Sequence, residues 1–227
     1  MKQSNREIFN KYSNSYEKIT QKKLNFFNKS REYFDSYKVK TIKENLGNNI
    51  ESILDYGSGI GLATKFFLDF FPAARIYAYD ISDESIKILK ESYPNINTNQ
   101  KEIFNSKFDL ITCFGVFHHI DKEERLKYLK LISNMLKDTG KLFIFEHNPY
   151  NPVTRHIVSN CPYDENVELI SMKEFISYAK KEKLLVCNKG YTLFFPERLK
   201  YFRKFEKKIR WLPLGGQYYL EFKKVKN

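Results

Sequence analysis

The sequence predicts a single α/β domain built on a doubly wound, mostly parallel sheet of seven strands. Strand-like and helix-like segments alternate from about residue 50 onward, which is the order that covers both faces of a parallel sheet with helices. The chain has 227 residues and is 42% hydrophobic, enough for one domain with a sizeable core. A glycine cluster also follows the first strand, at the sheet edge where ligands bind.

Apolar runs bounded by turn residues define the first predicted elements. Ile50–Asp55 is a short strand that ends in the glycine cluster, and the helix Leu62–Phe71 stops at a proline. A second strand at Arg75–Asp80 precedes the helix Ser82–Tyr93, whose first residue is a helix-capping serine followed by two acids. A weak third strand is expected at Ile96–Gln100.

The second half of the pattern is stronger. Phe108–Cys113 is almost continuously apolar, as expected for a strand buried on both faces. A helix is predicted at Glu123–Lys137, and the Asp-Thr-Gly turn after it leads to the strand Lys141–Phe145. The helix Ser171–Lys183 then precedes a strand at Leu184–Phe195.

The two ends of the chain differ from the central 48–150 segment. Residues 1–47 lack a strand pattern and are predicted to form a helical cap of two aromatic-rich helices. Residues 151–227 are expected to form the acceptor side of the domain and the C-terminal strands. They include a basic amphipathic helix at 197–211, inserted before a last strand at Gln217–Val225.

Composition excludes several classes of protein. The longest apolar or weakly polar run, Leu110–Phe117, is far shorter than the about 20 residues that cross a bilayer. Met1–Asn14 is polar where a signal peptide would be apolar. Cys113, Cys161 and Cys187 are odd in number and lack CxxC spacing, so neither a disulfide framework nor a metal site is expected. We expect a cytoplasmic protein.

The formal net charge of +12 is concentrated at the two ends. Residues 1–40 carry ten basic and four acidic side chains, and residues 197–227 carry ten basic and three acidic ones. The segment between them is close to neutral. This distribution indicates either an anionic partner that approaches the ends of the domain or a compositional bias towards lysine. It leaves the central fold without a basic surface for nucleic acid.

An acidic residue and three glycines follow the first strand. Asp55 ends that strand, and Gly57, Gly59 and Gly61 occupy alternate positions before the next helix. Glycine permits a sharp backbone turn and lets a ligand approach where a side chain would collide. The helix N-terminus adds N–H groups. A nicotinamide-binding loop needs glycine or alanine where this chain has Leu62, so that class is excluded.

This pattern resembles the small-molecule branch of the class I S-adenosylmethionine-dependent methyltransferases, over about residues 50–150. Asp55 and the glycines match the loop that holds the methionine part of the cofactor. Asp80 ends the second strand and matches the acid that accepts hydrogen bonds from both ribose hydroxyls, and Ile81 matches the residue that packs on adenine. The resemblance implies a Rossmann-like methyltransferase fold and S-adenosyl-L-methionine as the cofactor.

The same resemblance implies the other cofactor contacts. The strand at Phe108–Cys113 leads into a segment similar to the one that passes under the cofactor. The residue that meets the adenine amino group is the least clearly marked; Gln100 is preferred and Glu102 is the second choice. The expected cofactor-binding residues are Asp55, Gly57, Ser58, Gly59, Gly61, Asp80, Ile81, Gln100, Phe114 and Gly115.

Four residues are candidates for the catalytic groups. Methyl transfer requires alignment of the acceptor and, for a hydroxyl, removal of its proton. Histidine is the commonest base near neutral pH. His118 and His119 follow one predicted strand, and Glu146 and His147 follow the next, at the edge where open α/β sheets bind ligands. A helix start and a rigid polar loop would account for the same residues, so both interpretations stay open.

The expected reaction is methylation, most simply at oxygen, of a small-molecule, sugar or lipid-linked acceptor. The basic ends of the chain are compatible with an anionic acceptor and with peripheral membrane contact through residues 197–211. They are equally compatible with a plain lid over the site. RNA methylation and a cofactor-binding module without turnover are the other two hypotheses. Nucleic acid is disfavoured because no arginine-rich patch or RNA-binding module is evident. The oligomeric state is left open.

Overall fold

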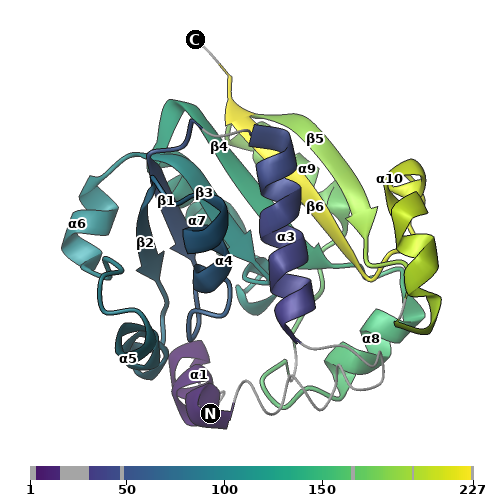
Figure 1. Cartoon of the computed structure of the whole chain (residues 1–227), viewed down its shortest axis with the longest axis horizontal. Helices are drawn as coiled ribbons and strands as arrows, with labels where there is room; N and C mark the ends of the chain where they lie inside the picture. The colour runs from purple at the N-terminus through teal and green to yellow at the C-terminus, as the bar shows by residue number, and fades with distance from the viewer. Residues whose placement is uncertain (1–3, 16–30, 47–48, 165–166, 196, 226–227) are drawn as a thin grey trace.

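The computed structural model describes residues 4–15, 31–46, 49–164, 167–195 and 197–225. Its described strands form one six-stranded sheet in the order β2-β1-β3-β4-β6-β5 (Figure 1). All neighbours are parallel except β6, which runs antiparallel to both β4 and β5. The strands are β1 Ser52–Tyr56, β2 Arg75–Tyr79, β3 Phe108–Phe114, β4 Leu136–His147, β5 Leu184–Thr192 and β6 Gln217–Lys224. The predicted doubly wound, mostly parallel fold is confirmed.

The predicted count of seven strands is wrong for the described residues. The strand expected at Ile96–Gln100 is reduced to a single parallel bridge between Asn97 and Tyr77. The cause is local, because the side chain of Asn99 accepts a hydrogen bond from the backbone N–H of Glu102 and caps a short helix instead. Strand β2 is therefore the edge of the sheet.

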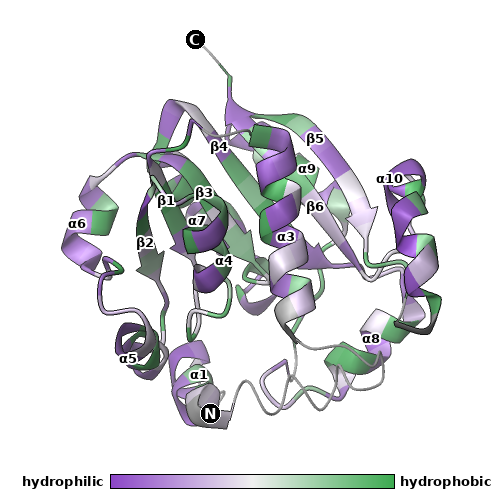
Figure 2. Cartoon of the chain, in the orientation of Figure 1, coloured by the Kyte–Doolittle hydropathy of each residue, from purple (hydrophilic) through white to green (hydrophobic). Residues whose placement is uncertain are grey.

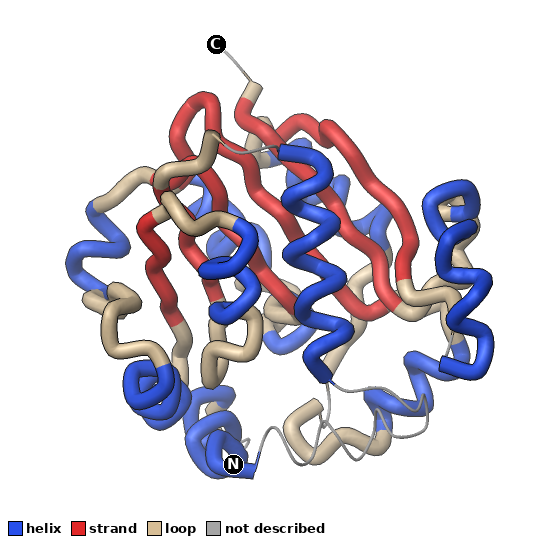
Figure 3. The backbone as a smooth tube through the Cα atoms, viewed as in Figure 1, coloured by secondary structure: helices blue, strands red, loops and turns tan. Residues whose placement is uncertain are grey.

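Helices cover both faces of the sheet (Figure 3). The described α-helices are α1 Asn5–Tyr12, α3 Arg31–Leu46, α4 Thr64–Phe70, α5 Asp83–Ser92, α6 Gln100–Asn105, α7 Arg125–Asn134, α8 Pro152–Ser159, α9 Met172–Lys181 and α10 Glu206–Ile209. The 3₁₀-helices are η1 Ser13–Ser15, η3 Phe117–His119 and η4 Glu197–Phe205. No helix in this part of the chain is long and apolar enough to cross a bilayer.

Alternate residues of the strands build two separate cores. On β4, Leu142 and Ile144 pack into the core on one face, with α6, α7 and α9. Phe143 and Phe145 pack into the core on the other face, with α3, α4 and α5. Figure 2 shows the corresponding concentration of hydrophobic residues on the central strands. A strand buried on both faces is apolar at nearly every position, and β3 follows this rule except at Asp109 and Thr112.

Parallel pairing of β3 with β4 aligns the ends of these two strands. Phe114 lies opposite Phe145, and the backbone N–H of Gly115 donates to the carbonyl of Phe145 over 2.8 Å. The residues that follow β3 and the last two residues of β4 therefore lie side by side at the carboxyl edge. This register brings the segment 115–119 next to Glu146 and His147.

The 197–211 segment lies between β5 and β6, as predicted, but it is not one amphipathic helix. It consists of η4, which contains a non-helical residue at Leu199, and the one-turn helix α10. Leu199, Phe202 and Phe205, which are apolar residues of the predicted amphipathic segment, are exposed rather than packed on the core. The anchor is Glu206, a buried carboxylate that accepts hydrogen bonds from the backbone N–H groups of Phe194 and Phe195.

The predicted N-terminal helices are seen in part. Helix α1 begins at a capping box in which Ser4 and Glu7 exchange hydrogen bonds between side chain and backbone. Helix α3 packs Val39 and Ile42 into the sheet core. The remaining aromatic-rich stretch of the expected cap, which includes Phe26, lies outside the described residues.

One polar interaction at the start of the sheet gives a stability prediction. Asp109 of β3 accepts hydrogen bonds from the backbone N–H and hydroxyl of Ser52 and from Lys137 Nζ. Burial alone would raise the pKa of Asp109, but the hydrogen bonds from Lys137 and Ser52 outweigh it and lower this pKa. We expect Asp109→Asn to lower the free energy of unfolding at pH 7 by about 1–2 kcal/mol.

The difference should disappear as the pH falls through the lowered pKa, because a protonated Asp109 no longer contributes its charge. Urea unfolding of both proteins at pH 7 and at about pH 2, well below the usual pKa of an aspartate, measures this. The exposed Asp69 on α4 provides the control, and Asp69→Asn should change neither value. Equal destabilisation by Asp109→Asn at both pH values would contradict the assignment.

Candidate active site

The loop between β1 and α4 depends on three glycines with positive φ. Gly57 and Gly61 have φ of 83° and 84°, and an added Cβ would collide with Val116 and Leu89 respectively. Gly59, with φ of 53°, differs because its added Cβ would meet no atom within 4 Å. Packing within the protein therefore explains two of the glycines. At Gly59 it leaves an open space that a ligand can occupy.

The neighbouring strand supplies a carboxylate to this loop. Asp80 follows β2, and its two oxygens accept hydrogen bonds from the backbone N–H groups of Gly59, over 2.8 Å, and Ser82, over 2.9 Å. Burial raises the pKa of Asp80, and these backbone hydrogen bonds oppose that rise. Each oxygen keeps further lone-pair capacity for a diol. Ile81, beside it, is 43% exposed and presents an apolar surface.

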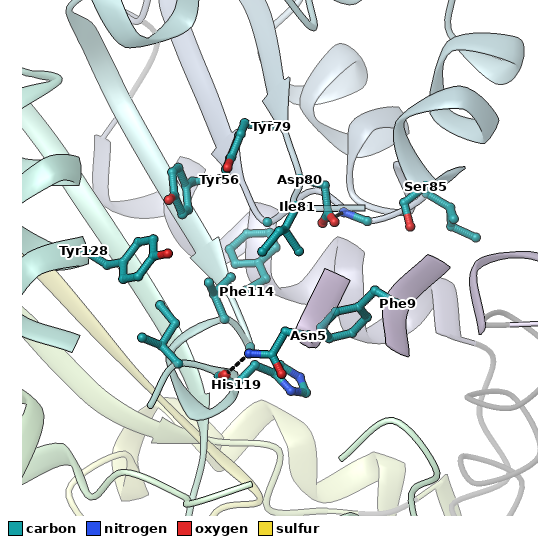
Figure 4. Close-up of a pocket in the computed structure, with 16 residues that line it drawn as sticks. Asn5, Phe9, Tyr56, Tyr79, Asp80, Ile81, Ser85, Phe114, His119 and Tyr128 are labelled. Atoms are coloured by element: carbon teal, nitrogen blue, oxygen red, sulfur yellow. Dashed lines mark hydrogen bonds between the residues drawn. The ribbon is translucent and has the colours of Figure 1, made fainter. Parts of the chain in front are cut away.

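These residues line a cleft that contains about 930 Å³ of space, part of it open to solvent. Figure 4 shows Asp80 and Ile81 on one side of this cleft and His119 on the other. Seven residues predicted from the sequence line it. They are Gly57, Gly59, Asp80, Ile81, Phe114, Gly115 and His119.

Four predicted cofactor residues do not line the cleft. Asp55 is buried, and its carboxylate accepts a hydrogen bond from the hydroxyl of Thr112 over 3.0 Å. Gly61 packs against Leu89. Ser58 lies in the glycine loop, and its Oγ is buried without a hydrogen-bond partner.

The prediction for Gln100 is not supported by its position. Gln100 is the exposed first residue of α6 and is absent from the lining of the cleft. The second choice, Glu102, bonds to the side chains of Asn97, Tyr77 and Arg75 at the sheet edge. The capping of α6 by Asn99, which removed the expected third strand, also turned this segment away from the cleft.

Helix α1 crosses the cleft, which the sequence did not indicate. Asn5 Nδ2 donates to the backbone carbonyl of His119, and the ring of Phe9 packs edge-on against the His119 ring at 4.9 Å (Figure 4). On the opposite side, Arg6 forms an ion pair with Asp83 at the start of α5. Both Asn5 and Phe9 line the cleft. A polar eight-residue helix carries no local signal for such a role.

The predicted catalytic residues come together at the ends of β3 and β4. Glu146 is fully buried and accepts hydrogen bonds from the backbone N–H groups of Val116 and Phe117. Its other oxygen lies 2.6 Å from His118 Nδ1. The ring of His118 in turn lies 4.0 Å from that of His119 and 5.1 Å from that of His147. The carboxylate thus fixes both the loop after β3 and the orientation of one imidazole.

Asp164 completes this cluster and was missed by the sequence analysis. It lies in the turn after α8, and its Oδ1 is 3.4 Å from His119 Nε2 and 3.8 Å from His118 Nε2. The tripeptide before it, Cys-Pro-Tyr, gave no pattern linked to chemistry. Only the tertiary fold brings a turn 45 residues from His119 to this position.

Burial and charge act against each other throughout the cluster. Burial would lower the pKa of His118, but the carboxylates of Glu146 and Asp164 outweigh it and raise that pKa to about 10. Burial and the nearby His118 lower the pKa of His147 to about 4 and that of His119 well below its usual value. Burial opposes ionisation of the two carboxyls as well, yet the neighbouring histidines lower both their pKa values.

A mostly parallel sheet, a glycine loop of this spacing, an acid after the second strand and a cleft beside them are the features expected of the S-adenosylmethionine-dependent methyltransferase class. A family model described as a methyltransferase domain matches residues 15–187, which is most of the chain. The chain belongs to this methyltransferase-domain family. The predicted class, and with it S-adenosyl-L-methionine as the cofactor, is confirmed.

Individual relatives agree with the family. An uncharacterized methyltransferase from Staphylococcus carnosus is 26% identical over 198 residues, which cover 82% of this chain and 90% of that protein. An uncharacterized protein from Rickettsia prowazekii is 29% identical over 102 residues; the match covers 40% of this chain and spans 41% of that protein's length. The fold is similar to that of a SAM-dependent methyltransferase from Archaeoglobus fulgidus, with a TM-score of 0.66, 16% identity and coverage of 87% and 96%.

The buried Asp55 gives a test of the glycine-loop architecture. Burial raises the pKa of Asp55 to about 7, against the opposing hydrogen bond from Thr112. Because this carboxyl holds its proton more tightly in the folded state, its contribution to stability should decline as the pH rises from about 4 to about 7. The stability of the natural protein relative to Asp55→Asn should fall over this range by on the order of 2–4 kcal/mol.

Urea unfolding at pH values about one unit apart between 4.5 and 8 measures the free energy of unfolding of the two proteins. The difference between the two free energies is then compared across the pH range. Groups other than Asp55 cancel in the comparison. The contribution of Asp55 to stability is expected to fall as the pH rises, whereas that of Asp109 is expected to grow. Asp109 therefore supplies an internal control in the same sheet. A difference that does not vary with pH would show that Asp55 is ionised throughout.

Proposed function

We propose that this protein transfers a methyl group from S-adenosyl-L-methionine to an oxygen of a small-molecule or lipid-linked acceptor. The observation that carries the proposal is the cleft between Gly59 and Asp80 on one side and His119 on the other. The first side provides the open space at Gly59 and the carboxylate of Asp80, and the second provides the imidazole of His119. Such a cleft suits a cofactor at one end and an acceptor at the other.

The cofactor end is assigned to residues of the glycine loop and of the loop after β2. Asp80 has lone pairs free for the ribose hydroxyls, and Ile81 offers a flat apolar contact for adenine. The open space at Gly59 accommodates the methionine part. When bound, the cofactor supplies an activated methyl group. Asp55 and Gly61 then act by shaping the loop rather than by contact.

The acceptor end is assigned to His119. Of the four predicted catalytic residues, His119 is the one that lines the cleft. Glu146 and His118 are buried behind it, and we assign them as positioning residues that hold the loop after β3. The ring of His147 packs against that of His118 at 5.1 Å, and His147 is not part of the lining of the cleft. An acceptor oxygen beside His119 would be aligned by the rigid end of the sheet.

Cofactor binding tests the first assignment. We expect Asp80→Asn to lower the affinity for S-adenosyl-L-methionine about 10–100-fold in calorimetry, because a hydrogen bond to a charged group contributes about 1.5–3 kcal/mol. Gly59→Asn should lower it as well, since asparagine tolerates the positive φ and its side chain fills the open space. Neither change should greatly alter thermal stability.

The exposed acid Glu84, at the start of α5, provides the matched control, and Glu84→Gln should bind the cofactor normally. Methyl transfer is then followed by release of S-adenosylhomocysteine with a panel of hydroxyl-bearing acceptors. Turnover should fall in Asp80→Asn and persist in Glu84→Gln. Normal cofactor affinity in both Asp80→Asn and Gly59→Asn would refute the site assignment.

The exposed face of the 197–211 segment supports contact with an anionic membrane surface. Tyr201 and Trp211 are 76% and 75% exposed, beside the exposed Lys204 and Lys208. Aromatic side chains of this kind enter the headgroup region, and lysines nearby are attracted to anionic lipid. The pattern favours a lipid-linked acceptor over a freely diffusing one. We prefer this interpretation to that of a plain lid, because none of the described residues of this segment lines the cleft.

Trp211 reports on this contact directly because it is the only tryptophan in the sequence. Its fluorescence should shift to shorter wavelength with vesicles that contain phosphatidylserine, and not with purely zwitterionic vesicles. The shift should be reduced by high salt and by the double change Lys204→Gln with Lys208→Gln. The double change Lys180→Gln with Lys181→Gln, at the exposed end of α9, removes the same charge elsewhere and should leave the shift intact. Equal losses in both pairs would point to non-specific attraction.

A further inference from the structure

Three side chains next to the cleft direct potential metal ligands at one point. His118, His119 and Asp164 each offer one ligand atom, and these atoms all lie within 4.8 Å of one another. The two imidazole Nε2 atoms are 3.8 Å and 3.4 Å from Asp164 Oδ1. Ligands about 2.1 Å from a tetrahedral zinc ion lie about 3.4 Å apart, so the spacing is close to that of a coordination site.

These contacts are not hydrogen bonds. Asp164 Oδ1 is buried and has no hydrogen-bond partner, although two imidazole nitrogens are near it. Asp164 as a whole is only 8% exposed, so water does not readily replace the missing partner. A buried carboxylate oxygen left unsatisfied costs free energy unless a charge balances it. Three potential ligand atoms gathered within 4.8 Å of one another around an unsatisfied carboxylate oxygen are typical of a cation site.

Glu146 provides the outer support that such a site needs. Its Oε2 lies 2.6 Å from His118 Nδ1, so in a neutral His118 this nitrogen would carry the proton and leave Nε2, 3.8 Å from Asp164 Oδ1, able to ligate a metal. A ligating histidine usually donates its second ring N–H to a carboxylate in this way, which fixes the tautomer and the ring orientation. The two backbone N–H groups of Val116 and Phe117 hold the carboxylate in turn.

The charge of the cluster also favours a cation. Glu146 and Asp164 are both buried, and among the described residues their ion pairs are only with histidines. No lysine or arginine of the described chain pairs with either carboxylate. When the imidazoles are neutral, as ligation to a metal requires, the two buried carboxylates give the cluster a net charge of −2, which one divalent ion balances.

We propose that His118, His119 and Asp164 bind one divalent transition-metal ion at the wall of the cleft. Two imidazoles and one carboxylate suit zinc and its neighbours better than magnesium or calcium, which prefer oxygen ligands. Three protein ligands leave a position open, as in catalytic zinc sites. We take the acceptor oxygen to occupy the open position of the metal, because His119 lines the cleft. Only this assignment of the fourth ligand rests on the proposed function.

Metal titration of the full-length, tag-free protein tests the site. After dialysis against a chelator, Zn²⁺ or Co²⁺ should bind with a stoichiometry of one per chain and raise the melting temperature. Bound Co²⁺ should develop visible absorption bands of a nitrogen- and oxygen-ligated ion. Asp164→Asn and His119→Ala should each weaken metal binding by more than about 100-fold. Loss of a group that only hydrogen-bonds to a ligand typically weakens it by about 10–100-fold.

The control is His156→Ala, because His156 is an exposed histidine on α8 and its loss should leave metal binding unchanged. Failure of the natural protein to bind either ion one to one would overturn the proposal, whether or not the variants fold. Binding that survives in both Asp164→Asn and His119→Ala would do the same. Calorimetry with S-adenosyl-L-methionine on the chelated protein tests the proposed function separately, since the cofactor residues are elsewhere in the cleft.

Discussion

The buried carboxylate of Glu146 is the interaction on which the site depends. Glu146 follows residues 142–145 of β4, which are apolar and buried on both faces of the sheet, and its carboxylate accepts two backbone hydrogen bonds from the loop after the neighbouring strand. Parallel strands leave such loops side by side, with N–H groups that the sheet itself does not satisfy. Glu146 satisfies two of them and positions His118 at the same time. One acidic side chain therefore couples the integrity of the sheet edge to the geometry of the cleft.

The sequence predicted most of the fold because the strongest signals were local. Strands buried on both faces must be apolar, and glycines with positive φ mark turns that other residues tolerate poorly. The failures came where a local alternative competed. At Asn99 a helix cap formed in place of an edge strand. In the 197–211 segment the apolar residues had helical spacing, yet the buried group is Glu206, and aromatic side chains are left in solvent.

The candidate site was predictable to a similar degree and for a similar reason. Asp80, Gly59 and the His118–His119 pair follow strand ends, where parallel sheets gather ligand-binding groups. Asp164 and Asn5 could not be predicted, because one lies in an unremarkable turn and the other in a polar helix, and each reaches the site only through tertiary packing. The sequence also gave no means to distinguish a residue that contacts a ligand, such as Gly59, from one that shapes the loop, such as Gly61.

Helix α1 bridges the cleft but buries none of its own residues. It is attached by an ion pair to α5 on one side and by contacts with His119 on the other. Detaching it breaks few interactions and leaves both cores of the sheet intact, so this helix belongs to the part of the molecule that opens at low free energy. Because α1 lines the cleft while it is attached, the rate at which it opens limits how fast a ligand in the cleft can be exchanged. Residues of α1 that never touch a ligand can therefore set the pace of turnover.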